Sequence, residues 1–497
     1  MHVAADGAQL AGGVAGADQL RPLVATALDG LAKGAADRGG PVPRGAPEDL
    51  ARTVESALGG DPLPAEGMGA AAALGSLART LASGAADPAD PACAAHLVCP
   101  PLAVAVAADL VVSALNPSLD SWDQAPAATT LEPAVIRTLA RLAGYDPRLA
   151  GGVLTTGGTA SNLMGLLLAR DAVAGREHHV DVAAPELPSR PAGQLRVFCS
   201  RAAHFSVART AAVVGIGAGV VRVRTDADHR MDPRALAQAI VGARARGEVP
   251  AAVVATAGTT DLGSIDPLRQ IAAVARENRV WLHVDAAYGG GVLFSPRLAP
   301  LLDGLAAADS VALDLHKLGW QPVPAGVFLA RDEELLAPLA QRVAYLNPRD
   351  DEDAGYPSLL GRSLRTTRRP DAFKVAVTLR ALGRSGLAAL VERCHALTRY
   401  AARAISAHPR LELAAEPVLM TVVFRYTPGG RPGNGNPDAV NAALRRRLLR
   451  EGRAVVGRTE LNGAVHLKLT LLNPHAAEAD VDALLAAVAR SGEEEHG

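Results

Sequence analysis

The chain has 497 residues, which is enough for two or three domains of ordinary size. Its 50 basic and 51 acidic side chains nearly balance, so the charge gives no reason to expect binding to nucleic acid or to an anionic membrane. Apolar residues form 49% of the chain, which excludes disorder throughout. Four cysteines without a Cys-x-x-Cys pair argue against a disulfide scaffold and a zinc site, so we expect no metal.

The first residues show no basic start followed by an apolar stretch, so a signal peptide is not expected. The longest apolar run, residues 102–115, is shorter than the roughly 20 residues of a membrane-spanning helix and contains Asp109. We therefore expect a cytoplasmic protein in which residues 102–115 form a buried helix. Leucines at helical spacing predict a helical arm over residues 1–90, disordered at its start and interrupted by a loop over residues 41–50.

Between residues 91 and 380, short apolar segments alternate with amphipathic helix patterns. Helices are predicted over residues 233–246 and 267–278, among others. This alternation predicts an α/β fold with a mostly parallel, doubly wound sheet. The apolar segments, each expected to be a strand buried on both faces, are residues 196–200, 219–224, 251–258, 280–287 and 310–315.

The last part of the chain has a different pattern. Strands are predicted over residues 419–426 and 465–473, separated by a loop rich in Gly, Pro and Asn and by a helix. A final helix follows, and the acidic residues at the end are expected to be frayed. The predicted domains are an N-terminal arm (1–90), a large domain (91–380) and a small α+β domain (381–497).

One glycine-rich segment, residues 151–171, is typical of a strand, a tight turn and a helix. Gly157 and Gly158 allow a sharp turn and a close approach of the backbone to a ligand. Residues 159–162 would form the first helical turn, whose free N–H groups suit an anion. The segment matches neither a Walker loop nor a dinucleotide fingerprint. A turn without a ligand is equally consistent with this segment alone.

Three further segments place reactive side chains where predicted strands end. Asp285 ends one strand, Lys317 follows another, and His204 follows a third. Each has an ordinary alternative, namely a capping carboxylate, a surface lysine and a structural histidine. Parallel strands bring such ends to one edge of a sheet. Together with the glycine turn, these residues suit pyridoxal 5'-phosphate, with Lys317 bonded to its aldehyde, Asp285 at the ring nitrogen and His204 stacked on the ring.

The order of these segments resembles the group II pyridoxal-phosphate-dependent amino acid decarboxylases, and most of all the bacterial diaminobutyrate and lysine decarboxylase branch. The resemblance implies fold type I with a seven-stranded sheet, and a homodimer with shared active sites. The segments that carry it are residues 155–171, 203–215, 255–268, 283–290 and 313–317.

The resemblance also implies roles for single residues. Tyr356, in the polar segment 347–362, would be the tyrosine that protonates the substrate carbon, although it is also consistent with an ordinary loop residue. The departures from the family pattern are Leu315, Leu318 and Gly319, which stand where aromatic residues are usual. The implied cofactor-binding residues are Gly158, Thr159 and Ser161 at the phosphate, Thr256 and Ala287 beside the ring, and Asp314 and His316 near the phosphate end.

We therefore expect decarboxylation of an L-amino acid, in particular a diamino acid such as 2,4-diaminobutyrate, lysine or ornithine, for polyamine or siderophore synthesis. Asp120 and Asp123 could bind a distal ammonium group, or could act only in a turn. Arg365, Arg368 and Arg369 could bind a carboxylate, or could pair with the acidic loop before them, within residues 347–362. The alternatives are an aromatic amino acid decarboxylase, an aminotransferase, another lyase, a non-catalytic relative and a nucleotide-binding α/β protein.

Overall fold

The computed structural model describes residues 10–178, 194–340, 343–428 and 436–496. By their contacts these residues form two compact units. The described residues of the first lie within 10–96, 396–416 and 421–496, and those of the second lie within 97–395 and 417–420. Units defined by contacts are not the same as domains, so the predicted division into three domains stays a prediction. The predicted disorder before residue 10 and most of the loop 427–437 lie outside the described residues.

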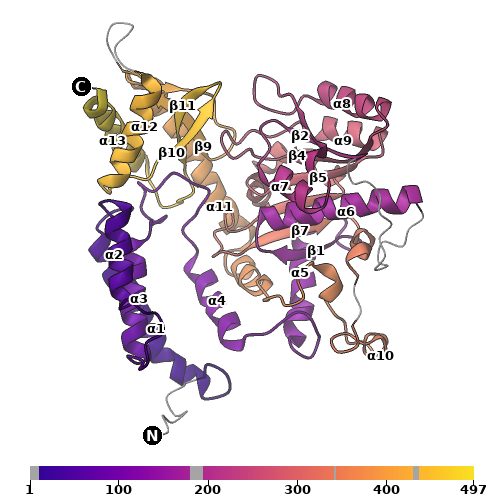
Figure 1. Ribbon diagram of the computed structural model, residues 1–497, viewed down its shortest axis with the longest axis horizontal. Helices are drawn as coiled ribbons and strands as arrows, with labels where there is room; N and C mark the ends of the chain where they lie inside the picture. The colour runs from indigo at the N-terminus through magenta and orange to yellow at the C-terminus, as the bar shows by residue number, and fades with distance from the viewer. Residues whose placement is uncertain (1–9, 179–193, 341–342, 429–435, 497) are drawn as a thin grey trace. The chain divides into compact units, whose positions relative to one another are not determined.

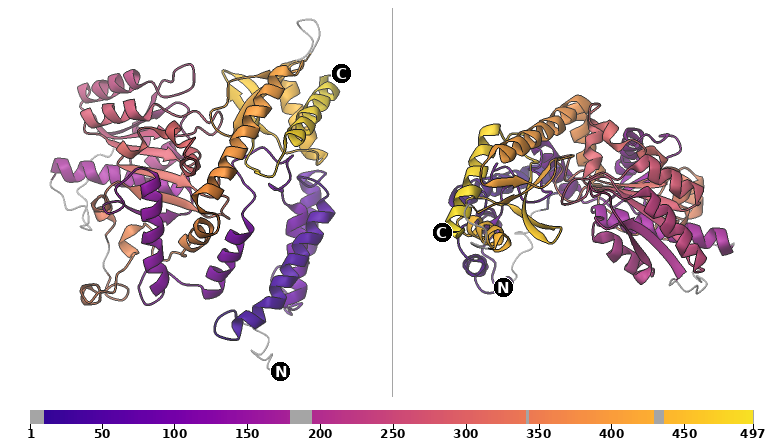
Figure 2. Two further views of the ribbon diagram at one scale, coloured as in Figure 1. Left: turned by 180° about the vertical axis from the view of Figure 1, so that it is seen from behind. Right: turned by 90° about the horizontal axis from the view of Figure 1, so that it is seen from above.

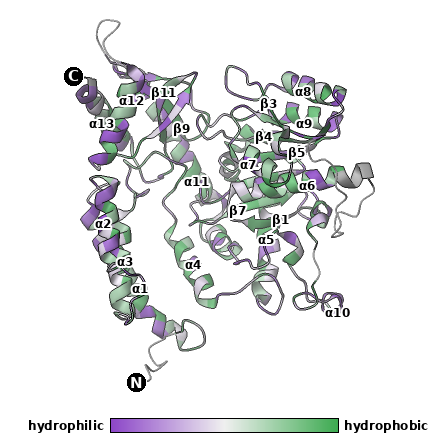
Figure 3. Ribbon diagram, viewed as in Figure 1, coloured by the Kyte–Doolittle hydropathy of each residue, from purple (hydrophilic) through white to green (hydrophobic). Residues whose placement is uncertain are grey.

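The second unit contains a seven-stranded sheet with the order β1-β7-β6-β5-β4-β2-β3 (Figure 1). Only β7 runs opposite to the other six strands, so the predicted mostly parallel α/β fold is confirmed. Figure 3 shows hydrophobic residues concentrated in these strands. The strands are β1 (Gly151–Thr155), β2 (Leu195–Ser200), β3 (Val220–Val223), β4 (Val249–Thr256), β5 (Trp281–Ala286), β6 (Ser310–Asp314) and β7 (Gly326–Ala330).

All five predicted strands of this sheet are present, but one is less buried than expected. β4, β5 and β6 lie in the middle of the sheet and are almost fully buried. β3 lies at the sheet edge, and its Arg222 is exposed. The prediction of burial on both faces is therefore wrong for β3, because an edge strand has a neighbour on one side only.

Helices and short 3₁₀ turns connect the strands of the second unit. The helices are α4 (Ala103–Leu115), α5 (Pro126–Leu142), α6 (Gly158–His178), α7 (Ser206–Val213), α8 (Pro233–Ala245), α9 (Leu268–Glu277), α10 (Arg349–Asp353) and the first part of α11 (Ala372–Ala407), which is kinked at Gly383. The 3₁₀ turns are η3 (Gly217–Gly219), η4 (Gly289–Phe294), η5 (Ala299–Leu302), η6 (Leu305–Ala307), η7 (Glu333–Leu339) and η8 (Leu360–Arg362).

Two of these helices concern the predictions directly. α6 packs against the strands β1 and β4–β7 and against α7, as the predicted strand–turn–helix segment requires. α4 corresponds to the predicted buried helix, but only one face of it is buried, and Leu115 is 71% exposed. Within the described ranges, no helix is long and apolar enough to cross a membrane.

The first unit combines three N-terminal helices with a small four-stranded sheet of order β10-β11-β9-β8. α1 and α3 lie side by side (Figure 2), because glycines let their backbones approach closely. A Cβ at Gly34 would lie 2.4 Å from the carbonyl oxygen of Arg79. The elements are α1 (Gly16–Arg38), α2 (Pro47–Ala57), α3 (Ala70–Gly84), the end of α11, β8 (Leu411–Leu413), β9 (Thr421–Tyr426), α12 (Pro437–Arg450), β10 (Gly457–Leu461), β11 (Ala464–Thr470) and α13 (Glu478–His496).

Two predictions for this unit need correction. A loop interrupts the N-terminal helices as predicted, but it ends at Ala46 and not at residue 50, because α2 begins at Pro47, a residue type that suits a first helical turn. The acidic residues at the end of the chain are not frayed but continue α13. Glu494 and Glu495 form ion pairs with Arg447 of α12, which gives this end of the helix a partner.

Candidate active site

The carboxyl ends of β4, β5 and β6 place three predicted site residues next to one another. Thr256 lies opposite Asp285 in the register of β4 and β5, and Asp314 ends the neighbouring β6. They border a cavity of about 290 Å³. The residues lining it are Leu97, Thr156, Gly157, Gly158, Thr159, Ala160, Asn162, His204, Ser206, Thr256, Gly258, Thr260, Asp285, Ala287, Tyr288, Asp314, His316 and Lys317.

The glycine turn between β1 and α6 forms one wall of this cavity. Gly157 has a φ of 145°, which favours glycine, and α6 begins at the next residue. A Cβ at Gly158 would lie 2.8 Å from the Cβ of Ala287, so only glycine fits between the turn and β5. The first N–H groups of a helix have no intrahelical acceptor, so this wall offers donors to an anion.

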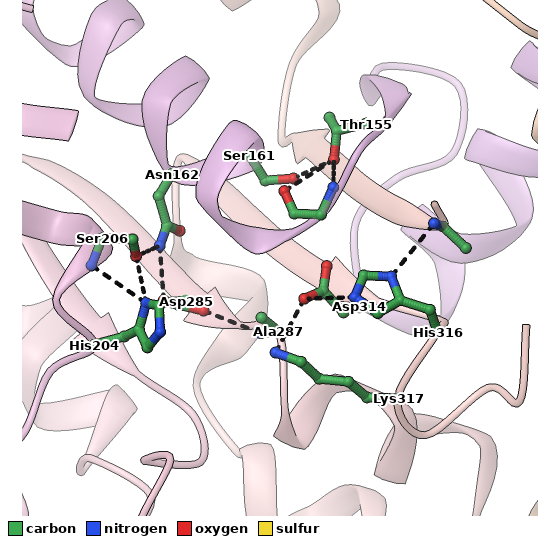
Figure 4. A network of polar contacts seen from close by, with 12 residues as sticks. Thr155, Ser161, Asn162, His204, Ser206, Asp285, Ala287, Asp314, His316 and Lys317 are labelled. Carbon is green, nitrogen blue, oxygen red and sulfur yellow. Dashed lines mark hydrogen bonds and ion pairs between the residues drawn. The ribbon is translucent and has the colours of Figure 1, made fainter. Parts of the chain in front are cut away.

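The Asp285 carboxylate is held by neutral donors on both oxygens. Asn162 Nδ2 donates to Asp285 Oδ2 over 2.8 Å, and the backbone N–H of Ala287 donates to Oδ1 over 3.1 Å (Figure 4). Asp285 is only 6% exposed. A buried carboxylate held in this way is available to a cationic or N–H group of a ligand.

The Lys317 side chain is paired with a different carboxylate. Its Nζ lies 3.0 Å from Asp314 Oδ2, which also lies 3.5 Å from His316 Nε2 (Figure 4). Burial lowers the pKa of His316 below its ordinary value, so this imidazole is neutral at pH 7. Lys317 is therefore the cation that faces Asp314.

His204 lies just before α7, where a hydroxyl fixes its ring. Its Nδ1 is 2.7 Å from Ser206 Oγ and also accepts the backbone N–H of Ser206 over 3.3 Å. Burial is the largest influence on His204 and lowers its pKa, although the charge of Asp285 opposes this. The ring is therefore mostly neutral at pH 7 and can pack on a planar ligand.

The cavity has polar atoms that protein groups do not satisfy. Among the described residues, Thr256 Oγ1 and Asp314 Oδ1 are buried without a hydrogen-bond partner. Buried polar atoms of this kind are uncommon and call for a ligand or water. A lysine, a fixed carboxylate, a neutral imidazole and an anion-binding turn around one cavity fit pyridoxal phosphate.

Comparison with known proteins supports the same assignment. The sequence pattern described as the pyridoxal-dependent decarboxylase conserved domain matches residues 54–427. The chain belongs to this family. Like its relatives, this decarboxylase uses pyridoxal phosphate and removes the carboxylate of an amino acid.

Two relatives of this chain are named for the same diamino acid. An L-2,4-diaminobutyrate decarboxylase of Rhizobium meliloti (strain 1021) is 45% identical over 87% of this chain and 84% of its own length. A second, from Acinetobacter baumannii, is 38% identical over 80% of this chain and 79% of its own length. The crystal structure of the glutamate decarboxylase domain of diaminobutyrate-pyruvate transaminase and L-2,4-diaminobutyrate decarboxylase from Vibrio parahaemolyticus is 33% identical. It covers 98% of both chains with a TM-score of 0.87.

The decarboxylase structure brings most predicted site residues to the cavity, but leaves two outside its lining. Ser161 is fully buried below the glycine turn, where its hydroxyl donates to Val327 O over 3.2 Å and contacts Thr155 Oγ1 at 2.8 Å. Tyr356 is 49% exposed and packs edge-on against Trp122, with ring centroids 5.1 Å apart. The predicted residues that do line the cavity are Gly158, Thr159, His204, Thr256, Asp285, Ala287, Asp314, His316 and Lys317.

The predicted arginine cluster has structural partners. Arg368 forms a buried ion pair with Glu132 over 2.7 Å. Arg369 pairs with Asp109 and Asp371 at 2.8 and 2.9 Å. Neither guanidinium lines the cavity of this chain. Their partners also lie outside the acidic loop 347–362, so the expected pairing with that loop is wrong for Arg368 and Arg369.

Sequence reasoning missed the side chains that hold the predicted ones. Asn162, Ser206 and His283 are all buried and hydrogen-bonded into one network with Asp285 and His204. One signal was present in the sequence. His283 and Asp285 are two residues apart on a strand and therefore point to the same face.

Proposed function

We propose that this decarboxylase converts L-2,4-diaminobutyrate to propane-1,3-diamine and CO₂. The observation that carries this proposal is the 45% identity to a diaminobutyrate decarboxylase over 87% of the chain. The intact lysine, aspartate and histidine around the cavity agree with a working enzyme. We also propose that the protein acts in the cytoplasm and supplies this short diamine for polyamine or siderophore synthesis.

The roles of the site residues follow from their positions. Bound pyridoxal phosphate supplies an electron-withdrawing ring that accepts the electron pair left by CO₂. Lys317 would bond covalently to the cofactor aldehyde and give way to the substrate amine. Asp285 would hold a proton on the ring nitrogen, and His204 would pack on the ring face and orient the substrate.

The glycine turn and its neighbours would hold the other end of the cofactor. The N–H groups of Gly158 and Thr159 would bind the phosphate at the start of α6, with His316 beside it. Ala287 leaves space next to the ring, and Thr256 presents an unsatisfied hydroxyl. A role for Ser161 would be indirect, through the position of the turn, because its hydroxyl is bonded beneath it.

We further propose a homodimer in which the second subunit completes each active site with Tyr356. The exposure of Tyr356 and its contact with Trp122 support this. Ser358 Oγ also donates to Asp120 O over 3.4 Å, so the segments around Asp120 and Tyr356 pack together. These segments would then reach the partner's cavity together, with the exposed Asp123 binding the distal ammonium of the substrate. Asp120 is buried and accepts from Gln124, so it would act only in the turn.

A panel of L-amino acids tests the substrate. CO₂ release is measured with 2,4-diaminobutyrate, ornithine, lysine, tyrosine, tryptophan and glutamate, and kcat/KM should be highest for 2,4-diaminobutyrate. A higher value for an aromatic or acidic amino acid would contradict the proposal. Formation of an oxo acid or of ammonia in place of stoichiometric CO₂ would indicate another reaction of the same scaffold.

Mixing two inactive variants tests the shared site. Lys317→Ala and Tyr356→Phe chains are inactivated at different residues, so a mixed dimer would contain one complete site. We expect partial recovery of activity after the two are unfolded and refolded together. No recovery, with a mass near the 50.9 kDa of one chain, would contradict the dimer.

A further inference from the structure

A chain of buried hydrogen bonds runs beneath the cavity and ends at two of its side chains. Trp281 Nε1 donates to Ser310 Oγ over 3.0 Å, and Ser310 Oγ lies 2.8 Å from His283 Nδ1. His283 Nε2 then lies 2.9 Å from Asn162 Oδ1. Trp281 is 5% exposed and the other three side chains are at most 1% exposed, so water does not compete for these bonds.

The donor groups determine the direction of the first hydrogen bonds in this network. An indole N–H can only donate, so the Ser310 oxygen accepts from Trp281 and its own proton is free to go to His283 Nδ1. His283 then carries its proton on Nε2 and donates it to Asn162 Oδ1. Burial lowers the pKa of His283 to about 4, so the ring is neutral at pH 7 and holds only this one proton.

Asn162 is the residue at which the hydrogen-bond network branches. Its Nδ2 has two hydrogens, and it lies 2.8 Å from Asp285 Oδ2 and 2.9 Å from Ser206 Oγ (Figure 4). The Ser206 oxygen therefore accepts from Asn162, and its proton goes to His204 Nδ1 over 2.7 Å. With Nδ1 occupied as an acceptor, the neutral His204 ring must carry its proton on Nε2.

We propose that Asn162, fixed by His283, is a positioning residue that holds Asp285 and His204 together and, with the backbone N–H of Ser206, keeps the proton of His204 on Nε2. This rests on the proposed roles of Asp285 and His204 toward the cofactor. Asp285 thereby keeps its carboxylate in a fixed position for the ring nitrogen. His204 presents an N–H donor through Nε2, a form that suits a substrate carboxylate.

The packing of α6 on β5 is built around the same histidine. Gly165 lies three residues after Asn162 on α6, and a Cβ there would be 2.6 Å from His283 Nδ1. Only a residue without a side chain lets the helix approach closely enough for Asn162 to reach both His283 and Asp285. Gly165→Ala should therefore displace the imidazole and weaken cofactor binding, although it adds one methyl group outside the cavity lining.

The test uses the full-length chain with cofactor added and four substitutions, of which His283→Gln is the matched control for His283→Leu. Asn162→Asp puts an acceptor where Asp285 needs a donor, so the Kd for pyridoxal phosphate should rise at least tenfold and kcat should fall about a hundredfold. His283→Leu should lower kcat about tenfold, whereas His283→Gln, whose amide N–H can replace Nε2–H, should stay within threefold of the wild type. Ser206→Ala cuts only the side-chain branch to His204, so the Kd for pyridoxal phosphate should rise less than in Asn162→Asp.

A nitrogen-15 spectrum of the histidine rings in the wild type reads the proton positions directly. We expect both His204 and His283 to be protonated on Nε2 at pH 7. We expect Ser206→Ala to keep the Nε2 proton of His204, because the backbone N–H of residue 206 still donates to Nδ1. Signals are assigned by loss in His204→Gln and His283→Gln.

Two results would overturn the proposal. One is a proton on Nδ1 of either ring, and the other is equal kcat and cofactor Kd in wild type, Asn162→Asp and His283→Leu. The proposed function fails differently, through the absence of CO₂ release by the wild type while the two ring tautomers remain as stated.

Discussion

Two carboxylates end neighbouring strands at the bottom of the same cavity, and they are held in opposite ways. Asp285 on β5 accepts from two neutral donors, Asn162 and the backbone of Ala287. Asp314 on β6 is paired with the charged amine of Lys317, and its second oxygen has no partner among the described residues. The Asp285 carboxylate has its hydrogen-bond partners before a ligand binds. The Asp314 carboxylate must exchange its partners when a ligand binds.

This difference separates the fixed part of the site from its reactive part. The Asp285 side rests on a network that continues down to Ser310, so binding a cofactor costs it little rearrangement. On the Asp314 side, the Lys317 amine must leave its ion pair and lose a proton before it can attack an aldehyde. We therefore expect substitutions on the two sides to affect different steps.

The largest effect should come from the reactive side. Lys317→Ala removes the only amine that lines the cavity in the described structure. Turnover should fall roughly a thousandfold or more, and the visible absorption of the bound cofactor should disappear. Turnover near the wild-type value in this variant would contradict the covalent role.

The next effect should come from the fixed side. Asp285→Asn keeps the size of the side chain but removes the negative charge at the ring nitrogen. We expect kcat to fall roughly 10²–10³-fold while the lysine still bonds to the cofactor, because the two sides act separately. If Asp285→Asn lost the cofactor absorption together with activity, the Asp285 and Asp314 sides of the site would not act separately.

The buried network should also make stability depend on pH. Folded His283 has a pKa of about 4 because burial disfavours its charged form, whereas the unfolded residue has the ordinary value of 6.5. Between these values the unfolded chain takes up a proton that the folded chain does not, so stability is lost as the pH falls. The expected contribution is on the order of 2–3 kcal/mol. Denaturant unfolding at pH 7 and pH 4.5 should show this loss reduced in His283→Gln, and an identical pH dependence in both proteins would contradict it.

The smallest effect should come from Asp314. Asp314→Asn removes the carboxylate 3.0 Å from the Lys317 amine, so the amine is freer to attack. Stopped-flow absorbance should show cofactor loading at pH 7 faster by roughly three- to tenfold, the range expected for breaking a modest ion pair. Slower loading would mean that Asp314 assists the bond and does not restrain the amine.

The sequence predicts the strand ends well because a buried strand followed by His, Asp or Lys is a strong local pattern. The order of these segments then identifies the family. It does not predict the network, because Asn162 and His283 are separated by 121 residues and meet only after α6 packs on β5. Nor does it predict the surroundings of Tyr356, since its contact with Trp122 joins two loops that carry no periodic pattern.

The central claim is tested most directly by mapping the covalent bond to the cofactor. The chain has only four lysines, Lys33, Lys317, Lys374 and Lys468, so borohydride reduction of the loaded enzyme followed by peptide mass spectrometry gives a clear answer. Lys374 is fully buried in ion pairs with Asp109 and Asp371. We predict that the reduced cofactor is found on the peptide containing Lys317 and on no other. Its presence on Lys374 or Lys468, with Lys317 unmodified, would contradict the account.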